Sequence, residues 1–216
     1  MLFCLWLYFF MSLSSDSKFF IGVIGVTIVI LVGAVFFFSR PAKDVAPETL
    51  IPVEAWATGS ATPKATLVEF SDFECPACGA AQPTVAKIVD TYKDELKFIY
   101  RHYPLDQHKN ARIAAEAAEA AGAQGKFWEM HDVLFKNQTN LSKETINGLG
   151  IELKLDMDKF TQDVTAEKYK DKIEKDIADG TALGVNSTPT FFLNSKKLNL
   201  FSFTDLETEV KKALGK

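Results

Sequence analysis

The chain has 216 residues, of which 47% are hydrophobic and 24% are charged, and its formal net charge is −4. The apolar content excludes an intrinsically disordered protein, and an acidic balance without a basic run argues against nucleic acid as a partner. The three cysteines, Cys4, Cys75 and Cys78, are too few for a scaffold held together by several disulfides or for a four-cysteine zinc site.

Residues 19–39 carry no charged side chain. As a helix they would be about 30 Å long, which is enough to cross the apolar core of a bilayer. A signal peptidase needs small residues at positions −3 and −1 of the cleavage site, and Ala42, which follows this run, has Arg40 two positions before it. We therefore predict an uncleaved transmembrane signal-anchor at residues 19–39, preceded by an N-terminal segment at residues 1–18. A buried core helix is the alternative.

The first residues form a separate apolar stretch that is too short to span a membrane. Met11 opens a segment with the composition that usually precedes a signal-anchor. This favours translation from Met11, in which case residues 1–10, including Cys4, would be an upstream extension absent from the protein. The alternative is that Cys4 is present, embedded in the membrane and inert.

Residues 40–64 contain four of the eight prolines. This composition predicts an extended linker between the anchor and a domain over residues 65–216. In that domain, short runs of β-forming apolar residues predict strands at 65–70, 96–100, 190–193 and 197–201. Asn194-Ser195 is the expected turn of a hairpin between the last two strands.

Helical spacing of apolar residues predicts helices at 75–91, 110–123, 127–137, after Ser142, at 158–180 and, capped by Thr204, at 204–214. The first two strands are joined through a helix and should therefore pair in parallel. The element order predicts an α/β fold. Its mixed central sheet is flanked by helices and interrupted by a helical insertion at about residues 105–182.

Cys75-Pro76-Ala77-Cys78 directly follows a predicted strand and opens a predicted helix. Proline suits the first helical turn, where no N–H donor is needed. A cysteine at this point faces unpaired N–H groups and the positive end of the helix, which stabilise its thiolate. Cys78, one turn later, can form a reversible disulfide with Cys75. The alternatives are a chance pair or half of a metal site, although no other residues show metal-ligand spacing.

The segments FSDFECPACGAAQP, RHYPL, AAEAAGAQGKFWEMHDVLF and VNSTPTFFL together resemble DsbA-like thiol-disulfide oxidoreductases of the thioredoxin superfamily, over about residues 61–216. The resemblance implies a thioredoxin fold with an inserted helical domain. It implies that Cys75 is the exposed nucleophile and Cys78 the buried resolving thiol. Thr188-Pro189 resembles the loop that carries a cis-proline and binds the substrate backbone beside Pro76 and Ala77. The redox-active disulfide would serve without any further cofactor.

Two features refine this picture. The dipeptide between the cysteines is Pro-Ala, without the histidine that would add a donor to the thiolate, so we expect a weaker oxidant than the strongest in the family. Glu69 lies on the first strand, whose apolar neighbours suggest that its side chain points into the interior near Cys78, where a buried carboxylate could carry the proton of that thiol. The resemblance implies the same role. An exposed strand glutamate is the alternative.

The other polar residues near the motif are assigned simpler roles. Asp72 and Glu74 are expected to be solvated flanks of the site. We expect His131 to be a core residue, and His102 and His108 to have capping or turn roles.

The favoured function is a membrane-tethered enzyme that introduces disulfides into thiol-containing unfolded or secreted polypeptides. Such chemistry belongs outside the cytoplasm, which places residues 1–18 in the cytoplasm and the domain on the extracytoplasmic face of a bacterial plasma membrane. The lipid bilayer would be contacted through residues 19–39. A DsbB-like or VKOR-like re-oxidant is implied by resemblance. The alternatives are a reductase or isomerase, or a non-enzymatic redox-sensing or metallochaperone module.

Overall fold

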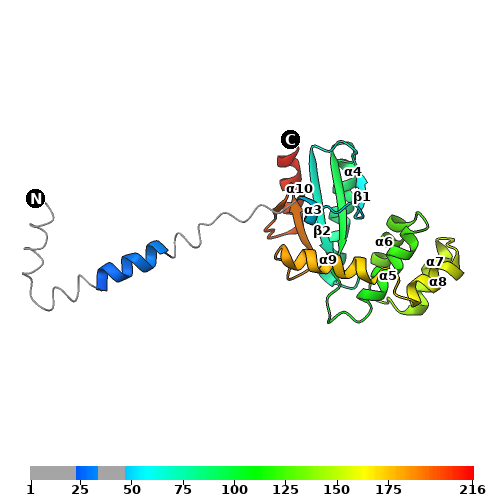
Figure 1. Cartoon of the computed structure of the whole chain (residues 1–216). Helices are drawn as coiled ribbons and strands as arrows, with labels where there is room; N and C mark the ends of the chain where they lie inside the picture. The colour runs from blue at the N-terminus through cyan, green and yellow to red at the C-terminus, as the bar shows by residue number, and fades with distance from the viewer. Residues whose placement is uncertain (1–22, 34–46) are drawn as a thin grey trace, which may run out of the picture. The chain divides into compact units, whose positions relative to one another are not determined.

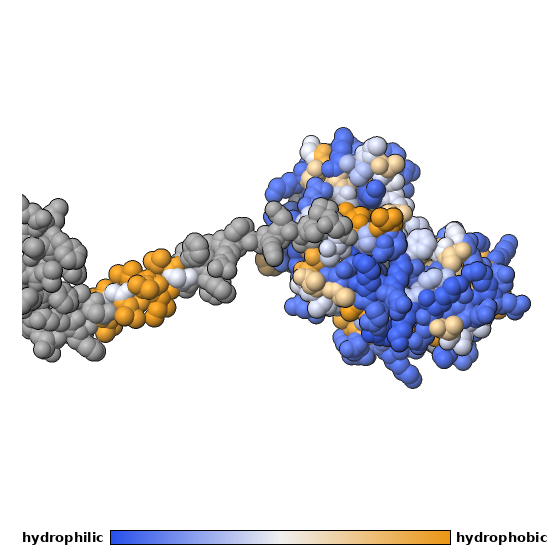
Figure 2. Space-filling model, viewed as in Figure 1, coloured by the Kyte–Doolittle hydropathy of each residue, from blue (hydrophilic) through white to orange (hydrophobic). Residues whose placement is uncertain are grey.

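The computed structural model describes residues 23–33 and 47–216. Residues 23–33 form a helix with exposed, uncharged side chains, which Figure 2 colours as hydrophobic. Among the described residues, no helix has both the length and the apolar character needed to cross a bilayer. The other residues of the predicted anchor at 19–39, and all of residues 1–18, lie outside the described part, so the anchor remains a prediction.

Residues 47–216 fold around a five-stranded sheet with the strand order β1-β3-β2-β4-β5 (Figure 1). The strands are β1 (Trp56–Gly59), β2 (Ala65–Ser71), β3 (Leu96–His102), β4 (Thr190–Leu193) and β5 (Lys196–Lys197). β2 and β3 pair in parallel, as expected, whereas the other neighbouring pairs are antiparallel. The predicted mixed central sheet is therefore confirmed.

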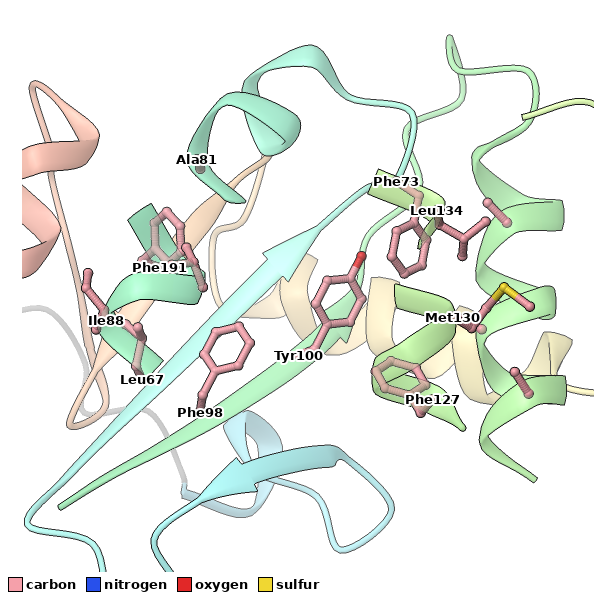
Figure 3. Packing of buried hydrophobic residues seen from close by; sticks show 14 of the residues in the cluster. Leu67, Phe73, Ala81, Ile88, Phe98, Tyr100, Phe127, Met130, Leu134 and Phe191 are labelled. Carbon is pink, nitrogen blue, oxygen red and sulfur yellow. The ribbon is translucent and has the colours of Figure 1, made fainter. Parts of the chain in front are cut away.

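Both faces of β2 and β3 are buried, which explains why apolar residues occupy successive positions in both strands rather than alternate ones. On one face, Leu67 and Phe98 belong to a core that includes Ile88 of α4 (Pro76–Thr91) and residues of α10 (Phe203–Ala213) (Figure 3). On the other face, Val68 and Ile99 pack with Leu50 of α3 (Pro47–Leu50). The sheet is thus the middle layer of the domain.

The helical insertion lies between β3 and β4. It comprises α5 (Ala111–Gly122), α6 (Phe127–Lys136), α7 (Lys143–Glu152), α8 (Met157–Thr165) and α9 (Lys170–Ala182). All but two residues of α5 are buried, and its alanine side chains let the neighbouring helices approach closely. α7 begins as expected, because the Ser142 side chain accepts a hydrogen bond from the Thr145 N–H.

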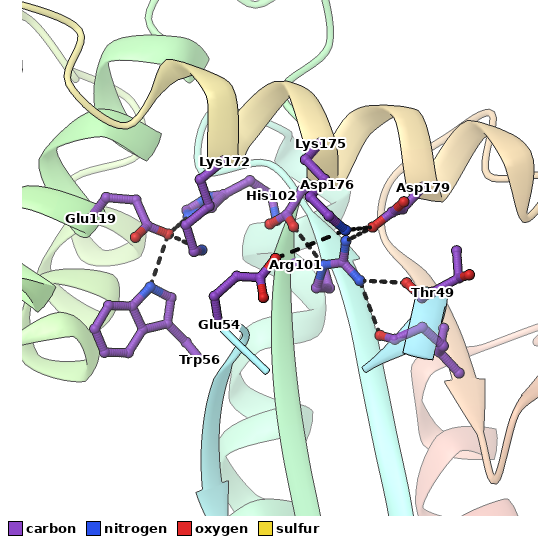
Figure 4. Close-up of polar contacts among 11 residues, drawn as sticks. Thr49, Glu54, Trp56, Arg101, His102, Glu119, Lys172, Lys175, Asp176 and Asp179 are labelled. Carbon is purple, nitrogen blue, oxygen red and sulfur yellow. Dashed lines mark hydrogen bonds and ion pairs between the residues drawn. The ribbon is translucent and has the colours of Figure 1, made fainter. Parts of the chain in front are cut away.

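α9 differs from the other inserted helices, because it packs against β3. Arg101 of β3 is completely buried and donates to Asp176 and Asp179 of α9 at 2.7 Å each (Figure 4). Its guanidinium also donates to the carbonyl oxygens of Thr49 and Leu50 in α3. One side chain therefore ties together the sheet, the last inserted helix and the start of the domain.

The structure corrects the linker predicted at residues 40–64. Residues 47–50 form α3, and residues 56–59 form β1, which pairs with β3. Trp56 of β1 stacks on Phe127, and its indole N–H donates to Glu119. Elements this short have little stability of their own, so it is their tertiary contacts, rather than a local pattern, that define them. Residues 40–46 lie outside the described part.

The helix predicted over residues 158–180 is two helices. α8 ends at Thr165, and Glu167 then adopts a positive φ of 48° before α9 begins. The Tyr169 N–H in this turn donates to the buried Glu116 of α5. The amphipathic pattern continues across the break, which is why it was not visible in the sequence.

Two predictions near the C-terminus are also corrected. The strand expected over residues 197–201 ends at Lys197. The last helix is capped by Ser202, and Asp205 completes a capping box with it, so Thr204 is inside the helix. The turn between β4 and β5 is placed as expected, since Asn194 and Ser195 both have positive φ.

Candidate active site

Cys75 is the N-cap residue of α4, with extended backbone angles (φ −74°, ψ 119°). No side chain caps this helix, and Pro76 occupies its first turn. The first N–H groups of a helix have no partner within the helix and carry the positive end of its dipole. The chain thus delivers Cys75 from the end of β2 to a point where a negative charge is stabilised.

The two cysteines, which are free thiols in this structure, differ in accessibility. Cys78 is completely buried, whereas Cys75 keeps 6% of its surface exposed. The expectation of an exposed Cys75 is therefore wrong in degree, although Cys75 is the more accessible of the pair. Its sulfur packs against the loop before β4, 3.4 Å from the Thr188 carbonyl oxygen.

The loop before β4 has the conformation that the resemblance implies, because the Thr188–Pro189 peptide bond is cis. Pro189 is half-buried, and Pro76 and Ala77 on the opposite side of Cys75 are exposed. The Thr188 hydroxyl is buried and has no hydrogen-bond partner among the described residues. The fold thus brings the four predicted substrate-binding residues around one sulfur atom.

The surroundings of the two thiols move their pKa values apart. The pKa of Cys75 falls from 9.0 to about 5, chiefly because Cys78 donates a hydrogen bond to it; burial opposes this effect, and the N–H groups of Cys78 and Ala77 add to it. Burial, the hydrogen bond with Cys75 and the charge of Glu69 raise the pKa of Cys78 far above its usual value. At neutral pH the pair therefore consists of a Cys75 thiolate and a Cys78 thiol.

Glu69 lies on β2 with only 3% of its surface exposed, so the alternative of an exposed glutamate is wrong. Burial raises the pKa of Glu69 to about 7. Its charge acts on Cys78 and on Tyr100, which lies opposite it in the register of β2 and β3. A carboxyl group that changes protonation near neutral pH therefore lies beside the buried thiol. Its part in proton transfer stays a prediction.

Asp72 is buried at 2% exposure, so the prediction of a solvated flank is wrong. One carboxylate oxygen accepts from the Glu74 N–H at 2.7 Å. The other accepts from the Leu105 N–H at 2.8 Å and lies 2.6 Å from His108 Nδ1. Glu74 in turn accepts from the backbone and side chain of Asn110. Both acidic residues therefore fasten the segment before Cys75 to the loop between β3 and α5.

Gln138, in the turn after α6, is a site residue that the sequence does not indicate. Its side-chain amide donates to the carbonyl oxygens of Phe73 at 2.9 Å and Cys75 at 2.8 Å. Gly79 on the second turn of α4 faces the same amide, and a Cβ there would collide with Gln138 Oε1. Residues 63 positions apart meet here, so only the fold reveals the contact.

The other histidines lie in the core. His131 is 3% exposed and surrounded by aromatic rings, and burial lowers its pKa, which confirms it as a core residue. His102 is also buried, with Nε2 at 2.9 Å from Glu119 (Figure 4). Within residues 23–33 and 47–216, no group of three or more potential ligands is arranged to hold a metal ion.

Comparison with known proteins gives two kinds of match. A model of the thioredoxin family matches residues 53–212. The chain is 41% identical over 133 residues to the Na(+)/H(+) antiporter NhaA 1 of Salinispora arenicola, and 36% identical over 160 residues to NhaA 1 of Mycolicibacterium vanbaalenii. These matches cover 61% and 71% of this chain but only 20% and 26% of the antiporters. The chain therefore spans about a fifth to a quarter of the length of these curated relatives.

Solved structures of similar fold cover most of both chains. A thioredoxin-like oxidoreductase from Silicibacter pomeroyi shares 27% identity at a TM-score of 0.70, covering 79% of this chain and 99% of that one. The thiol-disulfide exchange protein alpha-DsbA2 from Wolbachia pipientis shares 20% identity at a TM-score of 0.69, covering 77% and 90%. BdbD from Bacillus subtilis shares 23% identity at a TM-score of 0.66, covering 74% of this chain and 92% of that one. At such identities the last two likenesses show the fold alone.

Proposed function

The chain belongs to the thioredoxin family and is DsbA-like, and we propose that it exchanges disulfides with other polypeptides through Cys75 and Cys78. The observation that carries the proposal is the separation of the two thiol pKa values. A thiolate of low pKa is the better leaving group in exchange. Cys75 is therefore the sulfur that substrates attack and release, and Cys78 is the internal partner that closes the disulfide.

The reaction begins with the Cys75–Cys78 disulfide. A substrate thiolate attacks Cys75 Sγ, forming a mixed disulfide and releasing Cys78 as a thiolate. A second substrate thiolate then attacks the substrate sulfur of the mixed disulfide, which forms the substrate disulfide and releases Cys75 as a thiolate. Two substrate thiols are oxidised while the enzyme disulfide is reduced, and two protons are distributed between Cys78 and the solvent.

We assign the proton of Cys78 to Glu69. The buried Cys78 thiolate needs a proton at the first step, because its pKa is raised by burial. Glu69 has a pKa of about 7 and therefore holds a proton in a large fraction of molecules at neutral pH. A carboxyl group of this kind can donate the proton on reduction and take it back when the disulfide is formed again.

We assign substrate binding to Thr188 and Pro189, together with the exposed Pro76 and Ala77. The Thr188 carbonyl oxygen lies 3.4 Å from Cys75 Sγ, so a substrate bonded to this sulfur would lie beside the loop before β4. The substrates are unfolded or secreted polypeptides that contain thiols.

The direction of exchange and the location of the protein are further parts of the proposal. We assign the oxidising direction because the Cys75 thiolate stabilises the reduced enzyme, which makes the disulfide a better oxidant. Residues 19–39 would tether the domain to the extracytoplasmic face of a bacterial plasma membrane. This is supported by residues 23–33, which form a helix without charged side chains. A DsbB-like or VKOR-like membrane protein would re-oxidise Cys75 and Cys78.

A second candidate function is a redox-sensing module of a membrane transporter. The observation in its favour is the identity with parts of proteins named Na(+)/H(+) antiporters. Such a module would cycle between thiols and disulfide without turning over a substrate polypeptide.

Oxidative refolding of a reduced, unfolded substrate protein tests the proposal, using the full-length chain and an excess of oxidised glutathione. We expect catalysis by the wild type, no catalysis by Cys75→Ser, and accumulation of a mixed disulfide with Cys78→Ser. A wild-type protein that is folded but inactive in refolding and in insulin reduction would overturn the enzyme proposal and favour the sensor. A reduction potential near −270 mV, that of thioredoxin, would overturn the oxidising direction and favour a reductase.

A further inference from the structure

The Cys-Pro-Ala-Cys motif contains no histidine, but the fold brings one to it from another segment. His108 lies in the loop between β3 and α5, and its Nδ1 is 2.6 Å from an Asp72 carboxylate oxygen. The backbone carbonyl of the same Asp72 accepts from the Cys75 N–H at 3.1 Å. A single residue therefore connects the imidazole of His108 to the reactive cysteine.

The groups around His108 favour its protonated form. Asp72, Glu74 and Cys75 face it from the segment between β2 and α4, and all three carry negative charge when ionised. On its own loop, Asp106 and Lys109 are exposed to solvent. Burial lowers the pKa of His108, but the hydrogen bond and charge of Asp72, together with the charges of Cys75 and Glu74, raise the net value above 6.5.

A cation near Cys75 would offset the negative charges beside it. Asp72 and Glu74 lie within three residues of Cys75, and carboxylates at this range oppose the formation of a thiolate. Both are held in place by hydrogen bonds to the loop before α5, so neither can move away into solvent. Only 18% of the His108 side chain is exposed, so its charge is screened less than that of a surface lysine.

We propose that His108, held by Asp72, is a positioning residue of the exchange reaction whose imidazolium offsets the neighbouring carboxylates and stabilises the Cys75 thiolate. This inference rests on the proposed function, because the Cys75 thiolate is the leaving group of the proposed exchange reaction. It assigns to a residue 33 positions after Cys75 the electrostatic part that a histidine inside the motif would otherwise play. Asp72 orients the ring and keeps the proton on Nδ1.

The direct test is the pKa of Cys75 in the full-length protein, measured as the pH profile of its alkylation by iodoacetamide with peptide mass spectrometry to separate it from Cys4. We expect His108→Asn, which keeps a donor for Asp72 but carries no charge, to raise the pKa of Cys75 by about one. His108→Lys should restore part of the loss. The matched control is Lys109→Gln, which removes an exposed charge from the same loop and should leave the pKa of Cys75 unchanged.

A second measurement needs no substitution. Linkage is reciprocal, so the Cys75 thiolate must raise the pKa of His108 by as much as His108 lowers that of Cys75. NMR titration of the imidazole should therefore give a higher pKa in the reduced protein than in the oxidised protein, which has no thiolate. Equal values in the two forms, or an unchanged pKa of Cys75 in His108→Asn, would overturn the inference.

The reduction potential separates this inference from the proposed function. A tenfold loss of thiolate stabilisation should make the potential of His108→Asn about 30 mV more negative than that of the wild type. If the wild type exchanges disulfides and its potential does not respond to His108, the inference alone fails. If the wild type exchanges none while the two pKa values remain linked, the proposed function alone fails.

Discussion

Strands β2 and β3 carry two buried polar clusters that differ in how their charges are paired. In the register of the two strands Glu69 lies opposite Tyr100, and Phe70 lies opposite Arg101. Because successive side chains of a strand point to opposite faces, Tyr100 and Arg101 belong to different sides of the sheet. Arg101 meets carboxylates and carbonyl oxygens of α9 and α3 (Figure 4). Tyr100 and Glu69 meet the active site.

The difference lies in the partners. Arg101 has acceptors for its guanidinium from two carboxylates and two backbone carbonyls. Near Glu69 and the cysteines, by contrast, the buried hydroxyl groups of Ser71, Tyr100 and Thr188 have no partner among the described residues. A fully paired cluster holds one structure and one protonation state. Glu69 has no ion-pair partner among the described residues, and burial raises its pKa to about 7, so that its proton can move.

Removing the paired cation should have the largest effect on stability. Arg101→Met leaves the buried Asp176 without a counter-charge, leaves Asp179 paired with Lys175 alone, and removes the donors to Thr49 and Leu50. Breaking a buried pair in this way costs about 3–5 kcal/mol. We expect urea denaturation at neutral pH to show a loss in this range.

The matched control is Arg112→Met. Arg112 pairs with Glu174, and about half of each side chain is exposed to solvent. Exposed pairs contribute about 0–1 kcal/mol, so this variant should unfold close to the wild type. Similar losses in Arg101→Met and Arg112→Met would contradict the contrast between the two clusters.

Glu69→Gln tests the unpaired cluster and should stabilise the protein at high pH. The pKa of Glu69 is about 7 in the folded state against an ordinary value of 4.5, so the folded state binds the proton more tightly. The stability that the Glu69 carboxyl group contributes is therefore fully present below pH 4.5 and is lost as the pH rises through about 7. At about 1.4 kcal/mol for each pKa unit, the loss above pH 7 is about 3 kcal/mol, and Glu69→Gln should not show it.

The measurement is urea denaturation of the oxidised protein between pH 4 and 8, where neither cysteine titrates. The same variant should slow disulfide exchange roughly 100-fold, because the proton of Cys78 loses its carrier. Glu116→Gln is the control, since the pKa of Glu116 is also raised to about 7 by burial, but on α5. Glu116→Gln should alter the pH dependence of stability and leave the rate of disulfide exchange unchanged. Equal exchange rates in Glu69→Gln and the wild type would contradict the proton-carrier role.

Thr188→Val should have the smallest effect on stability. The valine keeps the shape of the side chain and removes a buried hydroxyl that has no partner among the described residues. Such a change is nearly neutral, or stabilises by up to about 1 kcal/mol. A stability loss above 1 kcal/mol would mean that the hydroxyl is already satisfied in the free protein.

The central strands and the cysteine motif were predictable because their signals are local. β2 and β3 are short runs in which β-forming apolar residues predominate, and Pro76 marks the first turn of α4 soon after β2. β1 was missed because it is only four residues long and follows several prolines. Glu167 was missed because a single residue with positive φ interrupts an otherwise continuous amphipathic pattern.

The residues of the candidate site also fall into those whose surroundings the sequence predicts and those whose surroundings it does not. Glu69 was predicted to be buried, because its neighbours on the strand are apolar. Asp72 was predicted to be solvated, since charged side chains near a turn usually are. Its actual position follows from three donors, of which two, Leu105 N–H and His108 Nδ1, come from a loop more than thirty positions away.

By itself, the sequence determined which atoms can react: two sulfur atoms separated by two residues at the start of a helix are a redox pair because the spacing and the helix end are local properties. Only the tertiary structure decided how they react. A pKa depends on burial and on charges a few ångströms away. Around Cys75 and Cys78 those charges and contacts come from Glu69, His108, Gln138 and Thr188, which the fold, rather than the order of the chain, makes neighbours.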